Sequence, residues 1–420
     1  MSIETTTLPS GLRIVTDTRS DAETVALTVN IAAGSRHESE NEHGLAHLLE
    51  HMAFKGTRRR SARAIAEEIE AVGGDINAAT STEHTSYTAR VLPGDVGLAI
   101  DILSDILLDS RFDSEELTRE KSVILQEIGA VEDTPDDLVF DLFGETAFPG
   151  QPIGRPILGT SARVRGFDRD AIASYLERHY AAPSVVIGAA GAVDHAVLVE
   201  AVSRGFERLP MHAPVVPTPA QYRGGQTRAK RRHEQANIVV GFEGVSFDDP
   251  ENYAAHVFAN AVGDGMSSRL FQEVRERRGL AYAISSFHWS FGDTGLFGFH
   301  AATGATDAGE VVVVALDELA RATVDLDDAE IRRAKALMKV GMLASLESSP
   351  ARAERVARQT ALFGRVIPLE EVVARIDGLT VDDVRKAGRR LLSTPPTVAA
   401  LGPIAKVPRL DAVTARVAGL

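Results

Sequence analysis

The same order of strand-like and helix-like segments occurs twice along this chain of 420 residues, on either side of a segment rich in proline and glycine. In each half, segments with β-branched and apolar alternation come first, and long helical patterns follow. The segment between them, residues 213–227, holds three prolines and two glycines and is typical of an interdomain linker. We therefore expect an α+β fold of two similar domains, residues 1–212 and 228–420, each a mainly antiparallel sheet flanked by long helices.

The composition excludes several kinds of site and partner. The chain contains no cysteine, which rules out disulfides, thiolate metal sites and cysteine nucleophiles. Its formal net charge of -14 argues against binding to nucleic acid by general charge attraction. The N-terminus has no signal-peptide pattern, and no apolar run is long enough to span a membrane. We expect a soluble, cytoplasmic protein with no membrane span and no nucleic-acid partner.

The segment from Gly44 to Phe54 is predicted to form a helix with two histidines on one face. His47 and His51 are one helical turn apart, so both imidazoles can bind a single zinc ion. Glu50 lies on the flank of the same face, where it can reach a metal-bound water without being a ligand. Two such histidines can also be ordinary surface or core residues, so the zinc interpretation needs a further ligand.

A catalytic zinc ion usually has three protein ligands and one open position. The best candidate for the third ligand lies in the helix predicted over Ser114–Ile128, which contains Glu120 and Glu127. These carboxylates are seven residues apart and therefore share a helix face. One can bind the metal while the other holds a ligand histidine through a hydrogen bond. Their spacing alone does not distinguish the two roles.

These motifs resemble those of the pitrilysin family, in particular its mitochondrial-processing-peptidase branch. The family's inverted motif H-x-x-E-H is here His47-Leu48-Leu49-Glu50-His51, within Gly-Leu-Ala-His-Leu-Leu-Glu-His-Met-Ala-Phe-Lys-Gly-Thr. Val-Ile-Leu-Gln-Glu at residues 123–127 resembles the family's V-I-L-x-E segment. Further similar segments are residues 73–80, 154–160, 267–271 and 275–282. The resemblance thus extends over nearly the whole chain.

The resemblance implies a zinc metalloendopeptidase with one zinc ion per chain and a processing-peptidase-like fold. It makes Glu127 the third ligand, beside His47 and His51, and it places Glu120 behind a ligand histidine. Glu50 becomes the general base. The resemblance also implies that Arg275 and Tyr282 bind substrate near the metal, with Tyr282 aiding the oxyanion.

A substrate-binding edge strand is also implied by the resemblance. Asn77, Ala78 and Thr80 would offer backbone groups to a peptide, or an unfolded presequence-like segment, in extended conformation. Glu83 belongs to the same substrate-binding segment. We expect His84 to be structural, because the metal already has three protein ligands.

Members of the family enclose their substrate between two halves, and a chain of this length supplies one half. The resemblance therefore implies a dimer in which Arg275 and Tyr282 reach the zinc ion of the partner subunit. A homodimer suffices, because this chain carries both the metal motif and the Arg275/Tyr282 segment. A heterodimer with a paralogous subunit is the alternative, and the sequence leaves open whether the two residues act within their own chain. The acidic balance suggests a chamber that favours basic peptides.

Two other functions are compatible with the same fold. The chain could be a non-catalytic assembly subunit, although its intact H-x-x-E-H motif argues against that function. It could also be a zinc hydrolase with a substrate other than a peptide, although the strand-like binding segment speaks for a peptide.

Overall fold

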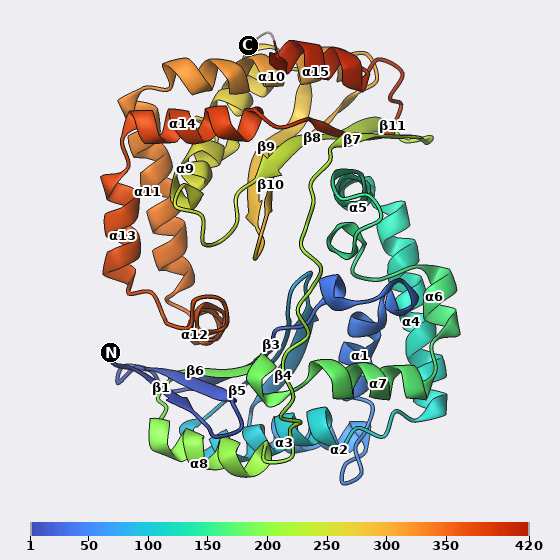
Figure 1. Cartoon of the computed structure of the whole chain (residues 1–420), viewed down its shortest axis with the longest axis vertical. Helices are drawn as coiled ribbons and strands as arrows, with labels where there is room; N and C mark the ends of the chain where they lie inside the picture. Colours follow the sequence, from blue (N-terminus) through green and yellow to red (C-terminus); the bar gives the residue numbers. More distant parts are fainter. Residues whose placement is uncertain (1, 419–420) are drawn as a thin grey trace. The chain divides into compact units, whose positions relative to one another are not determined.

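The computed structural model describes residues 2–418 and divides them into two compact units. The first unit comprises the chain up to Gly129, Arg155–Thr218 and Leu343–Ile367. The second comprises Ala130–Gly154, Pro219–Met342 and the chain from Pro368 onward. Each unit therefore contains a segment from the opposite half of the chain (Figure 1).

The first unit is built on a six-stranded sheet in the order β1-β2-β6-β3-β5-β4. Only β2 and β6 are parallel, and the other neighbouring strands are antiparallel. The strands are β1 (Ser2–Thr7), β2 (Arg13–Thr18), β3 (Val25–Ile31), β4 (Asp75–Thr80), β5 (Thr85–Val91) and β6 (Val185–Gly191).

The second unit has a five-stranded sheet in the order β7-β11-β8-β10-β9, with one parallel pair, β7 and β11. Its other neighbouring strands are antiparallel. The strands are β7 (Gly225–Lys230), β8 (Gln235–Gly244), β9 (Ala281–Ser290), β10 (Gly295–Gly304) and β11 (Thr397–Gly402).

The two sheets share one topology. If β2 to β6 are matched in chain order with β7 to β11, every neighbour and every direction in the second sheet repeats the first, and β1 is an addition to the first sheet. The predicted duplication and the mainly antiparallel α+β fold are therefore confirmed. One boundary differs: residues 225–227, predicted as the end of the linker, begin β7, because β11 from much later in the chain pairs with them.

Helices of the first unit cover its sheet and carry the H-x-x-E-H motif (Figure 1). They are α1 (Leu45–Ala53), α2 (Ala62–Ala71), α3 (Val96–Leu108), α4 (Ser114–Asp133), α6 (Ser161–Gly166), α7 (Arg169–His179), α8 (His195–Gly205) and α12 (Ser349–Phe363). The end of α4, from Ala130 onward, belongs to the second unit. Short 3-10 helices occur at η1 (Ser35–His37), η2 (Glu40–Glu42), η3 (Pro93–Asp95) and η5 (Ala182–Ser184). The predicted helices around the motif and at Ser114 are thus present.

The second unit has a corresponding set of helices. They are α5 (Pro135–Ala147), α9 (Asn252–Gly263), α10 (Ala308–Asp325), α11 (Asp328–Ser345), α13 (Leu369–Gly378), α14 (Val381–Leu392) and α15 (Leu410–Ala418), with the 3-10 helix η4 (Pro152–Gly154) and the π-helical turn η6 (Phe271–Arg277). No helix among residues 2–418 is long and apolar enough to cross a membrane.

The two halves of the chain exchange one helix each. Helix α12, from the C-terminal half, packs on β6, β3 and β2 of the first sheet, and α5, from the N-terminal half, packs on the matching strands β11, β8 and β7. Each helix lies over a glycine of a central strand: a Cβ atom at Gly188 would meet Ala353 and Ala357, and one at Gly241 would meet Phe143. The domains expected from the sequence, divided at a single linker, do not include this exchange of α5 and α12.

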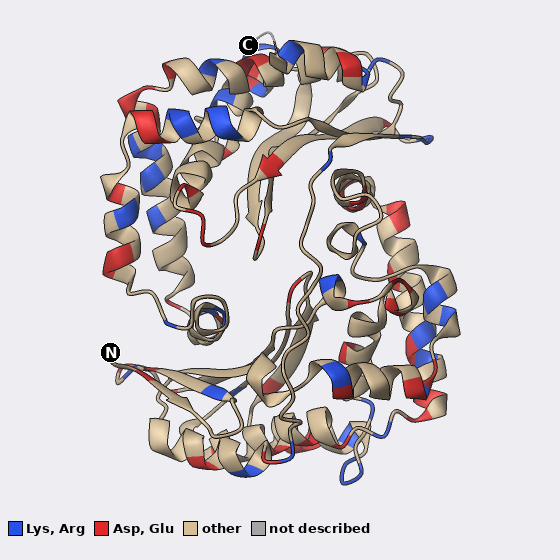
Figure 2. Ribbon diagram, in the orientation of Figure 1, with Lys and Arg blue, Asp and Glu red and all other residues tan. Residues whose placement is uncertain are grey.

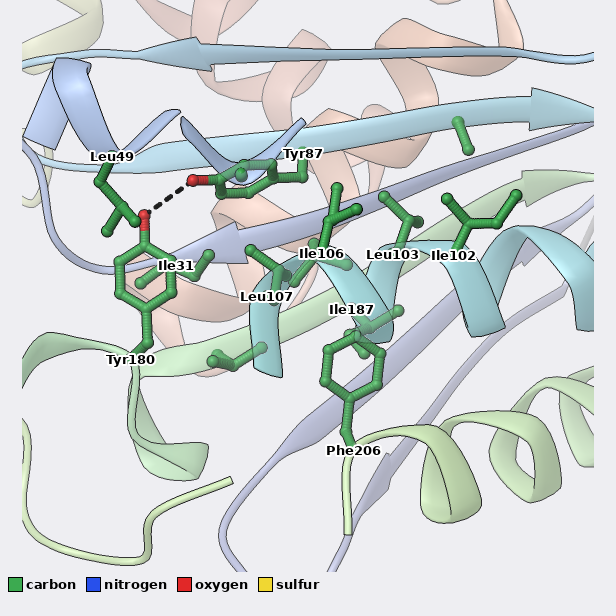
Figure 3. Close-up of a cluster of buried hydrophobic side chains, with 14 of the residues drawn as sticks. Ile31, Leu49, Tyr87, Ile102, Leu103, Ile106, Leu107, Tyr180, Ile187 and Phe206 are labelled. Carbon is green, nitrogen blue, oxygen red and sulfur yellow. Dashed lines mark hydrogen bonds between the residues drawn. The ribbon is translucent and has the colours of Figure 1, made fainter. Parts of the chain in front are cut away.

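The largest buried cluster of the first unit lies under α1. Leu45, Leu48, Leu49 and Met52 of that helix are buried in it. Figure 3 shows Leu49 together with Tyr87 of β5 and Tyr180, whose hydroxyl groups are 3.1 Å apart. Charged residues of both signs lie mostly on the helices and loops, and the strands carry few (Figure 2). The metal-motif helix is thus fixed by a large apolar core.

Replacement of Gly188 by alanine should loosen the exchanged helix α12. The added Cβ atom would lie 2.5 Å from the carbonyl oxygen of Ala353, so we expect a loss of about 1–3 kcal/mol in stability. Gly97→Ala is the matched control, because exposed Gly97 of α3 has no atom within 4 Å of its Cβ position. That control should gain about 0.5–1 kcal/mol. Urea denaturation followed by circular dichroism measures both, and equal midpoints would contradict the packing described.

Candidate metal centre

The start of α1 is held by a buried glutamate. Gly44 precedes the helix in the left-handed conformation, with φ of 96°, and provides no side-chain cap. The carboxylate of Glu38 takes that place, accepting hydrogen bonds from the backbone N–H of Gly44 at 2.9 Å and of Ala46 at 2.7 Å. Two of the helix's first amide groups are satisfied in this way. The position of the H-x-x-E-H motif therefore depends on a residue outside it.

The segment of residues 154–160, noted in the sequence for its resemblance, lies against this helix start. His43 Nε2 donates a hydrogen bond to the Pro156 carbonyl at 2.8 Å. Gly159 packs directly on the chain before α1, since a Cβ atom there would lie 2.5 Å from the His43 carbonyl oxygen and 2.7 Å from Gly44 Cα. The glycine is thus required by close backbone approach, and the segment helps to position the metal-motif helix.

Three predicted ligands come together at one point. His47 Nε2 and His51 Nε2, from α1, lie 3.7 Å and 3.8 Å from Glu127 Oε2 of α4. Among the described residues, these three form the group of histidine and acidic side chains able to hold a metal ion, with ligand atoms within 4.8 Å of one another. Two imidazole nitrogens and one carboxylate oxygen are a donor set suited to a catalytic zinc ion with an open position.

The hydrogen bonding of this group fits a bound cation. Glu127 Oε2 is buried, yet it has no hydrogen-bond partner among residues 2–418. A buried carboxylate oxygen without a partner is costly, and a metal ion at the meeting point would satisfy it. Burial, aided by the neighbouring His51, lowers the pKa of His47 to about 4. His47 is therefore neutral near pH 7, in the form that binds metal.

Glu120 contacts the candidate ligand His51 through the ring nitrogen that is not directed at Glu127. Its Oε2 atom accepts a hydrogen bond from His51 Nδ1 at 3.0 Å, which leaves His51 Nε2 directed toward the ligand group. Its Oε1 atom lies 2.7 Å from the ammonium of Lys55. The structure thus places Glu127 beside both histidines and Glu120 behind His51, a distinction that their spacing in the sequence did not make.

Glu50 is held beside the ligand group by a residue of the edge strand. Thr80 Oγ1, at the end of β4, donates a hydrogen bond of 2.5 Å to Glu50 Oε2. Burial raises the pKa of the Glu50 carboxyl, and the hydrogen bond from Thr80 opposes that shift. A carboxylate with a raised pKa, oriented by a neighbour, is well suited to accept and return a proton.

The residues of the predicted substrate strand have more varied environments. Strand β4 is the last strand of its sheet, so one of its edges pairs with no strand among residues 2–418 and is called the free edge. On it, Asn77 accepts a hydrogen bond from the backbone N–H of Ala78 through its own side chain. Glu83 follows in the next loop and pairs with the buried Arg36 at 2.6 Å. His84 bonds Ser81 Oγ at 2.8 Å.

Comparison with known proteins identifies the family. The protein-family model described as insulinase (peptidase family M16) matches residues 13–161 of the sequence. The family model described as the peptidase M16 inactive domain matches residues 166–338. An uncharacterized zinc protease of Streptomyces coelicolor is 38% identical over 413 residues, with 96% of this chain and 90% of the relative covered. The chain belongs to peptidase family M16. The resemblance to the pitrilysin family is thereby confirmed.

Other M16 relatives cover similar lengths. A probable mitochondrial-processing peptidase subunit beta of Arabidopsis thaliana is 37% identical, covering 96% of this chain and 79% of the relative. Among solved structures, a chain of complex III2 from Candida albicans superposes with a TM-score of 0.86 at 23% identity, covering 99% of this chain and 100% of that chain. A peptidase M16 inactive domain from Pseudomonas fluorescens gives a TM-score of 0.89 at 20% identity, with 97% and 100% covered. These two structures share the fold.

Arg275 and Tyr282 lie in the second unit of this M16 chain, on η6 and β9. The guanidinium of Arg275 is 5.3 Å from the centre of the Tyr282 ring and 4.8 Å from that of Phe271. Tyr282 is 74% exposed. The structure thus brings the two residues together as a cation–π pair with an accessible phenol.

The second unit contains a copy of the motif helix without its chemistry. Helix α9 matches α1 in the shared topology, and His47 and His256 each lie nine positions before a glycine of positive φ, Gly56 and Gly265. From this alignment, Glu50 and His51 correspond to Ala259 and Asn260. His256 is instead packed edge-on against His288, with ring centres 4.5 Å apart. This agrees with the inactive-domain model that matches this part of the chain.

Sequence reasoning missed three residues of the site. The Glu38 carboxylate bonds the start of α1, and the Thr80 hydroxyl bonds Glu50 of that helix. Lys55, just beyond α1, pairs with Glu120 of α4. For Lys55 a signal was present, because it continues the four-residue spacing of His47 and His51. For Glu38 and Thr80 the sequence alone gives no comparable signal.

Proposed function

We propose that this chain is a zinc-dependent endopeptidase that hydrolyses peptides or unfolded, presequence-like segments. The observation that carries the proposal is the convergence of His47, His51 and Glu127 beside Glu50, with a buried Glu127 oxygen that lacks a partner among the described residues. Membership of peptidase family M16, and relatives named zinc proteases, support it.

The chain's own residues divide the chemistry between them. His47, His51 and Glu127 would hold the zinc ion, which when bound supplies Lewis-acid polarisation of a carbonyl group and acidification of water. Glu50 would accept a proton from the attacking water and deliver it to the leaving amine. Thr80 would keep the Glu50 carboxylate turned toward the reacting atoms.

The free edge of β4 supports a peptide as the substrate. An extended peptide can add to such an edge through backbone hydrogen bonds, which fix its register and tolerate different side chains. Thr80 belongs to this strand and bonds the base directly, so a peptide paired along Asn77 and Ala78 would pass close to Glu50. Glu83, as partner of Arg36, would shape the loop that follows.

A dimer would complete the site. We propose that Arg275 and Tyr282 act on substrate at the zinc ion of a partner subunit, with Tyr282 aiding the oxyanion. The exposure of Tyr282 and its contact with Arg275 support a role in binding. A homodimer is sufficient, and the relative named as a beta subunit keeps a heterodimer as the alternative.

A non-catalytic assembly subunit is less well supported. The second unit shows how this helix differs when the chemistry is lost, with Ala259 and Asn260 in place of a base and a ligand. The first unit keeps every corresponding group. Zinc binding and peptide cleavage by the purified chain distinguish the two functions.

Glu50→Gln should retain zinc and lose turnover. The amide cannot accept a proton, so peptide cleavage should fall about 10²–10⁴-fold, while the three ligands are unchanged. Zinc content per chain and cleavage of an unfolded peptide are measured together. Glu67→Gln, the same change on the exposed face of α2, should leave both at the wild-type level. Undiminished cleavage by Glu50→Gln would refute the assigned base.

Thr80→Val should lower kcat while zinc is retained. Valine has the shape of threonine but cannot donate to Glu50, and a hydrogen bond to a charged group is worth about 1.5–3 kcal/mol, or roughly tenfold to hundredfold in rate. Thr80→Ser keeps the hydroxyl and should stay close to wild type. Steady-state kinetics on one peptide compare the two, and equal kcat values would remove the orienting role.

Mixing two inactive variants tests the dimer. Glu50→Gln lacks the base and Arg275→Ala lacks the substrate contact, so each alone should be slow. If the contact is made across a homodimer, mixed dimers hold one complete site, and randomly mixed subunits should recover roughly a quarter of wild-type activity. Mass spectrometry of tagged subunits verifies the exchange. Exchange without recovery would place Arg275 in its own chain's site.

A further inference from the structure

Helices α1 and α4 contact each other at the metal centre through a series of charged and ligating side chains. On one side His47, His51 and Lys55 follow one another at intervals of four residues along α1 and its C-terminal extension. On the other side Glu127 and Glu120 lie two turns apart on α4. Glu127 faces the two histidines, and Glu120 faces His51 and Lys55. The contact of Lys55 with Glu120 thus extends this series of contacts beyond the three candidate ligands.

Glu120 lies where an apolar residue would be expected. It belongs to the buried stripe of α4 that otherwise consists of Leu117, Ile124 and Ile128, and it is only 6% exposed. A carboxylate in such a position needs partners for both oxygens. His51 Nδ1 supplies one at 3.0 Å, and Lys55 Nζ supplies the other at 2.7 Å.

Lys55 is brought to Glu120 by the way α1 ends. Its backbone N–H donates to the Met52 carbonyl at 3.2 Å, so the chain still follows the last helical turn at this point. Gly56 then turns the chain away with φ of 106°. The Lys55 side chain is 31% exposed, and its ammonium lies within ion-pair distance of the more deeply buried Glu120.

We propose that Lys55 is a positioning residue of the metal centre: by fixing the Glu120 carboxylate, it orients the His51 imidazole and so sets how tightly the site binds zinc. The inference rests on the proposed zinc function. Glu120 has several rotatable bonds, and without Lys55 only one of its oxygens is held. Partners behind a metal ligand typically contribute 10–100-fold to metal affinity.

An ion pair that merely joined two helices would behave differently. Its loss would lower the stability of the zinc-free protein and would leave the dissociation constant for zinc unchanged. A positioning role makes the opposite prediction for zinc affinity and ties the effect of Lys55 to the presence of the Glu120 carboxylate. The two roles are therefore separated by equilibrium zinc binding in a double-mutant cycle.

The experiment measures the zinc dissociation constant of the full chain by competition with a chromogenic chelator. Lys55→Met should weaken binding about 10–100-fold, and Lys55→Arg should recover part of the loss. Glu120→Gln should also weaken binding, and adding Lys55→Met to it should have little further effect. Lys55→Gln is a second neutral variant, so the comparison stands if one variant folds poorly. Urea denaturation of the zinc-free proteins records stability separately.

Lys339→Met is the matched control, because it removes an ion pair of 2.5 Å with Asp377 on helices of the second unit. It should leave zinc affinity unchanged. Wild-type affinity in Lys55→Met and Lys55→Gln would overturn the inference and leave the proposed function intact. Losses that simply add in the double mutant would also overturn it, since Lys55 would then not act through Glu120. A wild-type chain that binds no zinc would remove the proposed function as well.

Discussion

The register between α1 and α4 is the constraint on which the metal centre depends. Both histidines belong to one helix and the remote carboxylate to another, so a shift of either helix by a fraction of a turn would separate the ligand atoms. The register is fixed at several points: Glu38 and Gly159 hold the start of α1, its apolar face is buried in the core, and Lys55 pairs with Glu120 beyond its end. The candidate site of three side chains is thus supported by a much larger set of contacts.

The duplicated fold separates what the architecture requires from what the chemistry requires. Both units keep the same strand order and a helix in the place of α1, yet the second has an alanine and an asparagine where the first has Glu50 and His51. In that copy His256 packs edge-on against the buried His288, and desolvation lowers the pKa of His256 to about 4. The scaffold therefore tolerates loss of the metal chemistry without a change of topology.

The parts of the structure that local patterns determine were predictable from the sequence. The helix with His47 and His51, and the shared face of Glu120 and Glu127, follow from helical spacing, while the resemblance assigned the roles. The pairing of β7 with β11 and the position of α12 were not predictable in this way. Helix α12 meets the sheet through the small residues Ala353 and Ala357 over Gly188. Its partner strands lie far away in the sequence, so no local pattern connects the helix to them.

The exchange of α5 and α12 has a consequence for the order of synthesis. A chain emerging from the ribosome completes the strands of the first sheet by Gly191, but the helix that covers one of its faces starts only at Ser349. During that interval the face of the first sheet that α12 will cover has no native partner. An exposed apolar sheet face of this kind is prone to aggregation. Final assembly of the first unit therefore waits for most of the second to be translated, and the helices of the candidate metal centre rest on a scaffold that is finished late.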